Sequence, residues 1–80
     1  MSSFGQVSLR DIRTMLDECA PGHRIEERTH HYCVYYQDKV YPTLPKGPHG
    51  KSNPLIQKGH IKKMARHLGI LECAKSVLSL

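Results

Sequence analysis

The amino-acid sequence predicts one small α+β domain with the order helix, strand, strand, strand, helix, followed by a short C-terminal helix. Apolar residues recur at helical spacing over residues 9–19 and again over residues 61–68. Between them, residues 31–44 are rich in aromatic and β-branched residues, which favour strands. With 80 residues the chain has room for a single domain, which we assign to residues 8–80, after a flexible N-terminus over residues 1–7.

The first predicted helix has a start signal and a stop signal. Residues 8–11, Ser-Leu-Arg-Asp, have the form of a capping box, with a hydroxyl at the N-cap and a carboxylate three residues later. Residues 20–22, Ala-Pro-Gly, end the helix. The apolar stripe between these signals consists of Leu9, Ile12, Met15, Leu16 and Cys19.

Three strands are predicted after this helix. Residues 23–28 form a weak, polar strand, whereas residues 31–36, His-Tyr-Cys-Val-Tyr-Tyr, form a strong one. A short turn over residues 37–39 leads to the third strand, residues 40–44. Because Pro42 has no N–H to donate to a ladder, we expect this strand to lie at a sheet edge or to end early.

The last third of the chain begins as a loop and continues as helix. Residues 45–54 contain three prolines and two glycines, which excludes a long helix or strand there. Asn53 and Pro54 have the form of an N-cap followed by proline at the first helical position, although Gly59 also allows a later start. Gly69 is the expected stop of this helix. The apolar positions of this helix and of the short helix after it are Ile61, Met64, Ala65, Leu68, Ile70, Leu71, Ala74, Val77 and Leu78.

The positive charge of the chain is concentrated in one stretch. Twelve Lys and Arg against seven Asp and Glu give a formal net charge of +5. Residues 1–38 carry a net −2, whereas residues 39–71 carry +7 and no acidic residue. Such a polarised surface is typical of proteins that bind phosphate groups, above all those of nucleic acid. The alternative is a solvated basic face that only keeps the chain soluble.

Composition also bears on function class and location. The chain is too short for a nucleotide-binding enzyme domain or a barrel, and it has no apolar run near the ~18 residues of a membrane helix. Gly50-Lys51-Ser52 lacks the first glycine of a phosphate-binding loop, and the six histidines lack the paired short spacing of a zinc site, so we assign no metal and no cofactor. Three cysteines without CxxC spacing, and no secretory signal, predict reduced thiols in a cytoplasmic protein.

Two short motifs carry a resemblance to a known family. Residues 28–31, Arg-Thr-His-His, are followed by the strand residues Tyr-Cys-Val-Tyr, and residues 58–70 run from Lys-Gly-His to Leu-Gly-Ile. In this order they resemble the HicA family of small mRNA interferase toxins, with Arg28 and Thr29 standing where that family has Gly and Ser. The resemblance covers roughly residues 8–70. It implies a fold like that of a double-stranded-RNA-binding domain, in which two helices pack on one face of a three-stranded antiparallel sheet.

The resemblance also implies an activity and a partner. HicA-like toxins cleave mRNA, act without a metal, and are covered by an antitoxin protein. A histidine suits proton transfer because its ordinary pKa of about 6.5 lies near neutral pH. The candidate catalytic residues are His31 and His30, of which only one can face the RNA because neighbours in a strand point to opposite faces. We favour His31, with Arg28 as a nearby phosphate ligand.

The last long helix carries a second candidate site. Lys58, Lys62 and Arg66 are spaced i, i+4, i+8, with Lys63 beside them, opposite the apolar side. A ladder of cations on one helix face fits a row of RNA phosphates. The same segment resembles the Lys-Lys-x-Ala-Lys start of the phosphate-gripping helix in double-stranded-RNA-binding domains. The alternatives are therefore a non-catalytic RNA-binding module, or a chain with no RNA role in which this is an ordinary solvated face.

Overall fold

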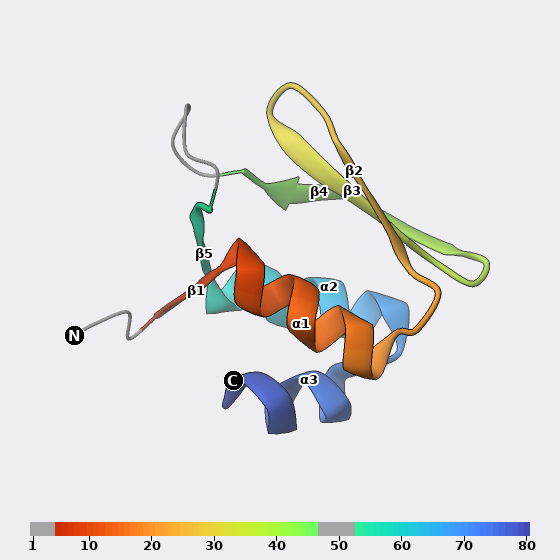
Figure 1. Cartoon of the computed structure of the whole chain (residues 1–80), viewed down its shortest axis with the longest axis vertical. Helices are drawn as coiled ribbons and strands as arrows, with labels where there is room; N and C mark the ends of the chain where they lie inside the picture. Colours follow the sequence, from red (N-terminus) through yellow and green to blue (C-terminus); the bar gives the residue numbers. More distant parts are fainter. Residues whose placement is uncertain (1–4, 47–52) are drawn as a thin grey trace.

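The computed structural model describes residues 5–46 and 53–80. These residues contain three helices and five strands. In chain order they are β1 (Gln6–Ser8), α1 (Leu9–Cys19), β2 (Arg24–Glu27), β3 (His31–Tyr36), β4 (Lys39–Pro45), β5 (Leu55–Gln57), α2 (Lys58–Leu68) and α3 (Leu71–Leu78). Figure 1 shows this arrangement. The predicted order is confirmed, and the two short strands β1 and β5 are additional.

The main sheet is antiparallel, with the order β2-β3-β4. Its strands are joined by tight turns, and β4 is an edge strand, as Pro42 predicted. The register of β3 against β4 shifts between Tyr32 and Val34, which pair with Leu44 and Tyr41. This irregularity falls opposite Pro42 and Thr43 of β4, where a regular ladder cannot form in full because proline has no N–H.

The inner face of the sheet closes over the helices. Tyr32, Val34 and Leu44 point from it into a core that they share with the apolar stripes of α1 and α2. α2 packs against β4, and α3 packs against α1 and α2, on the side away from the sheet in Figure 1. The structure is therefore a small α+β domain with a three-stranded antiparallel sheet and three helices. No described helix is long and apolar enough to cross a membrane.

The helix signals that act locally are confirmed. The Asp11 N–H donates to Ser8 Oγ at 3.2 Å, so Ser8 is the N-cap of α1. Gly69 ends α2 in the left-handed region with φ of 79°, and the N–H of Ile70 donates to the Ala65 carbonyl at 2.9 Å. The bond from residue 70 back to residue 65 is that of a Schellman motif, which requires a residue such as glycine at this φ.

Two predictions are wrong, one about the N-terminal residues and one about the start of the last long helix. Gln6 and Val7, expected in a flexible N-terminus, belong to β1, which pairs antiparallel with β5. Asn53 does not cap the last long helix, because β5 intervenes and α2 begins at Lys58. Instead, Asn53 Oδ1 accepts a hydrogen bond of 2.8 Å from the N–H of Arg10, in the first turn of α1. The asparagine does cap a helix, but one that lies 43 residues earlier in the chain.

The prediction of three reduced thiols is also corrected. A disulfide joins Cys19, the last residue of α1, to Cys73 in the first turn of α3, with a Cα–Cα distance of 5.7 Å. The two cysteines are 54 residues apart, and only the packing of α3 against α1 brings them together. Cys33 is free and buried. It lies in β3 but outside the core cluster, since its side chain points to the outer face of the sheet.

Candidate functional site

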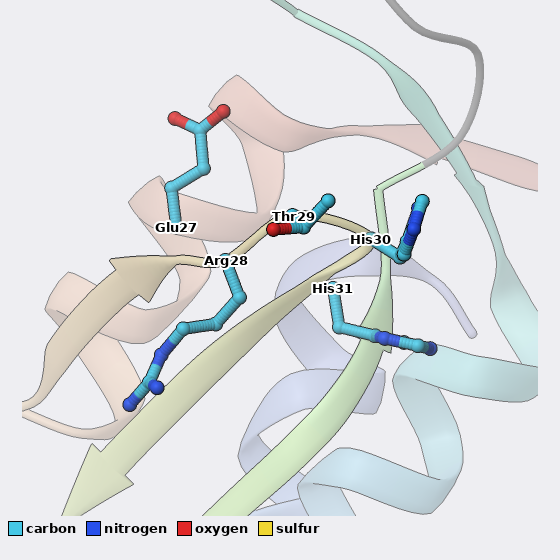
Figure 2. A pocket seen from close by; sticks show the side chains of 5 residues that line it. All are labelled: Glu27, Arg28, Thr29, His30 and His31. Atoms are coloured by element: carbon cyan, nitrogen blue, oxygen red, sulfur yellow. The ribbon is translucent and has the colours of Figure 1, made fainter.

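Three of the predicted signature residues, Arg28, Thr29 and His30, lie in the turn between β2 and β3, and the fourth, His31, begins β3. The Arg28 N–H donates to the His31 carbonyl at 2.8 Å, which leaves Thr29 and His30 as the two residues of the loop. Glu27 pairs with Tyr32, so Arg28 and His31 are the next cross-strand pair and their side chains share one face. Figure 2 shows Glu27 and Arg28 directed to opposite sides of the strand.

These five consecutive residues, from Glu27 to His31, line an open depression at the tip of the hairpin (Figure 2). His31 is exposed and stands in register with Pro45 at the end of β4. His30 is exposed at the loop. Arg28, His30 and His31 therefore line one depression, but Figure 2 shows the Arg28 guanidinium directed away from the two imidazoles. Either imidazole can reach a molecule in this depression from solvent.

Arg28 is held on the outer face of the sheet by a small polar network. Its guanidinium donates to Glu26 Oε1 at 2.8 Å and to the Tyr35 hydroxyl at 3.1 Å. The Tyr35 hydroxyl in turn donates to Glu26 Oε1 at 3.1 Å. Arg24 binds the second oxygen of Glu26 at 3.0 Å and stacks over the Tyr35 ring at 4.7 Å.

This network sets the charge state of its carboxylate. The pKa of Glu26 is lowered, first by the hydrogen bond from Tyr35 and then by the charges of Arg24 and Arg28. The hydrogen bond with Tyr35 likewise raises the pKa of Arg28, with Glu26 as the next cause. Arg28 therefore carries a full positive charge that a neighbouring carboxylate already balances.

The other side of the hairpin has its own ion pair. Lys46 Nζ lies 2.6 Å from Glu27 Oε2 and donates to the Arg28 carbonyl at 3.0 Å. The hydrogen bond and charge of Lys46 lower the pKa of Glu27. Both carboxylates of β2 are therefore bound to cations, Glu26 by two arginines and Glu27 by a lysine.

The cations of α2 have different surroundings. Lys62, Lys63 and Arg66 are exposed, and none of them makes an ion pair with any residue in 5–46 or 53–80. Lys58 departs from this row, because it is half-buried and its Nζ donates to the Ser79 carbonyl at 3.4 Å. The lining of the hairpin depression includes no α2 residue. The two predicted sets of site residues thus form two separate regions.

Two features were missed in the sequence. The residues Arg24, Glu26 and Arg28 alternate along β2, and this period of two is the signal for a charged row on one sheet face. The other is an aromatic pair beside α2, where the Tyr41 and His67 rings lie 5.7 Å apart. Tyr41 belongs to β4 and His67 to the last turn of α2, so only the packing of these two elements reveals the pair.

The described residues contain no group of three or more His, Cys, Asp or Glu side chains that could hold a metal ion. The segment Gly50-Lys51-Ser52, considered above as a phosphate loop, lies outside the described residues. Comparisons with family models, with curated proteins and with solved structures found no match. The likeness to HicA toxins accordingly stays a prediction from the sequence.

Proposed function

We propose that this chain binds RNA through the exposed cations of α2. The observation that carries the proposal is the absence of any carboxylate partner for Lys62, Lys63 and Arg66 within the described part of the chain. A phosphate can approach these side chains without displacing a protein anion. The cations near the hairpin, by contrast, are already bound to glutamates.

The strength of such binding follows from counterion release. Each phosphate neutralised on a single strand contributes about −0.7 to the slope of log affinity against log salt. Three cations therefore give an expected slope of about −2. Binding of this kind depends little on base sequence, because phosphates carry no sequence information.

The test is a titration of a labelled RNA oligonucleotide at several salt concentrations. Lys62→Glu and Arg66→Glu should each weaken binding and make the slope shallower. Lys75→Glu is the matched control, since Lys75 is exposed on α3 and the charge change is the same. Binding that ignores salt, or that Lys75→Glu weakens as much as Arg66→Glu, would count against the proposal.

A second candidate function, RNA cleavage, is favoured by the grouping of Arg28, His30 and His31 around one depression. One histidine would take a proton from the attacking 2′-hydroxyl or water, and a second group would return a proton to the leaving oxygen. Arg28 would stabilise charge on the phosphate after turning away from Glu26. In this case the chain would act as an mRNA interferase, with an antitoxin protein as its partner.

Cleavage is tested with the double variant His30→Ala/His31→Ala. Wild type should cut RNA in the presence of a chelator and arrest growth on induction, and the double variant should do neither while still binding RNA. Arrest that survives the double substitution would reject histidine catalysis. Since α2 is unchanged in this variant, its RNA affinity also separates cleavage from binding.

A further inference from the structure

The Cys19–Cys73 disulfide lies in an open depression where α1 ends and α3 begins. Both cysteines are half-buried, and Lys39 and Arg66 line the same depression. Lys39 Nζ is 3.5 Å from the point that a Cβ on Gly69 would occupy, beside the C-terminal end of α2. Neither cation makes an ion pair in the described ranges. The disulfide therefore lines an open depression together with two cations that make no ion pair in the described residues.

We propose that this disulfide is a thiol–disulfide exchange site for a small anionic thiol. The thiolate attacks one cysteine sulfur and forms a new S–S bond, while the old bond breaks and its electron pair leaves on the other cysteine as thiolate. A second thiol molecule then attacks the mixed disulfide. In total, two thiols are oxidised to one disulfide, and the protein disulfide is reduced to two cysteines.

The two cations act on both partners of this reaction. Lys39 and Arg66 attract an anionic thiol to the depression, which raises its encounter rate. They also stabilise the cysteine thiolate that leaves, because a nearby cation lowers the pKa of a thiol. Glu72 lines the same depression and opposes part of this effect.

The helices give the exchange a direction. Cys73 is the third residue of the eight-residue helix α3, near its positive end, whereas Cys19 is the last residue of α1, at its negative end. A thiolate is stabilised at a helix N-terminus and disfavoured at a C-terminus. Cys73 is thus the better leaving group, and the incoming thiol should become attached to Cys19.

The first experiment measures the rate of exchange on the folded, oxidised chain. Glutathione is the anionic thiol and 2-mercaptoethanol the neutral one, and mass spectrometry follows the product after acid quenching. Lys39→Gln/Arg66→Gln should slow glutathione about fivefold more than 2-mercaptoethanol. Arg10→Gln/Arg13→Gln removes the same charge outside the depression and should leave the ratio of the two rates near that of wild type. An unchanged ratio in the first variant would overturn the proposal.

The second experiment needs no variant. After brief exposure to glutathione, alkylation and peptide mapping should find glutathione on Cys19 and the alkyl group on Cys73. In addition, the rate ratio of glutathione to 2-mercaptoethanol in wild type should fall as salt is raised, because salt screens the two cations. Attachment mainly at Cys73, a ratio insensitive to salt, or a purified chain without the disulfide would each overturn the proposal. None of these results depends on whether the chain binds RNA.

Discussion

Cations on the hairpin and cations on α2 are similar in number but differ in what surrounds them. Arg24 and Arg28 share Glu26 on the outer face of the sheet, whereas Lys62 and Arg66 make no ion pair in the described residues. In a strand, residues two apart lie on one face, so the alternation of Arg, Glu and Arg brings both arginines to one carboxylate and leaves a net charge of +1 there. On α2, the residue four positions after Lys62 is Arg66, and no carboxylate occurs anywhere in residues 39–71.

This difference shows that net charge is a poor guide to where a polyanion binds. Arg24, Arg28 and Lys46 each lie within 3.0 Å of a carboxylate, and the two arginines share that of Glu26. Exposed pairs of this kind contribute little to stability, but they fix the direction of an arginine side chain. A phosphate at the hairpin must compete with Glu26, and a phosphate at α2 competes only with water and counterions.

The largest expected effect is a loss of stability on removing the disulfide. This bond joins α1 to α3, which packs against α2. Opening a link between residues 54 positions apart should lower the free energy of unfolding by about 2–4 kcal/mol, because the unfolded chain gains conformational freedom. Urea unfolding of wild type and of Cys19→Ser/Cys73→Ser measures the loss. Cys33→Ser serves as the control for the loss of a thiol without a cross-link. Equal stability of the double variant and wild type would mean that α3 packing alone fixes this end.

A smaller effect is expected from matched arginine substitutions in the two regions. Arg66→Gln should lower RNA affinity about three- to tenfold, and Arg28→Gln by less than about twofold, since only Arg66 lacks a carboxylate partner. Titration of the same oligonucleotide at one low salt concentration measures both. If Arg28→Gln causes the greater loss, the hairpin and not α2 is the main contact.

Glu26→Gln should raise RNA affinity, whereas the two arginine substitutions lower it. It removes the one carboxylate that Arg24 and Arg28 share, so both guanidinium groups become available to phosphate. We expect RNA affinity to rise about two- to fivefold and the salt slope to steepen. Combining Glu26→Gln with Arg28→Gln should cancel most of the gain. The combined variant has the net charge of wild type, so a gain that persists in it would trace to the release of Arg24 and not to that of Arg28.

The smallest effect is a dependence of stability on pH, which we expect from the two glutamates of β2. Glu26 and Glu27 have a folded-state pKa below the ordinary value of 4.5, so their ion pairs stabilise the fold above that pH. This contribution is lost as the pH falls through the lowered pKa values. The urea concentration at the midpoint of unfolding should therefore fall as the pH is lowered below about 4.5. It should fall less steeply in Glu26→Gln/Glu27→Gln. Adding salt should reduce the difference between the two proteins; a difference that salt leaves intact would point to a cause other than ion pairing.

Much of the fold could be predicted because its signals are local. The cap at Ser8, the stop at Gly69 and the strand His31–Tyr36 depend on residues within one or two turns of chain, and all three are confirmed. The pairing of β1 with β5 and the capping of α1 by Asn53 could not be predicted, because each joins segments more than 40 residues apart. The same reason hid the disulfide.

For the candidate site, too, local features could be predicted and contacts between strands could not. Arg28, His30 and His31 are consecutive or nearly so, and the sequence alone placed them together. The role of Tyr35 and Glu26 in holding Arg28 depends on the register of β2 against β3, which the sequence leaves open. That register decides whether the arginine is available to a ligand, so the chemistry of the hairpin was the part that could not be read in advance.

The short ribbon of β1 and β5 has a consequence for how the chain folds during synthesis. The first turn of α1 donates hydrogen bonds to residues that are made late: Arg10 N–H donates to Asn53 Oδ1, and Leu9 N–H to the Pro54 carbonyl. A nascent chain that ends at Pro45 already contains α1 and the whole three-stranded sheet, but it lacks these partners and α2. We expect such an intermediate to expose the inner face of its sheet, so the domain closes only when its last third leaves the ribosome.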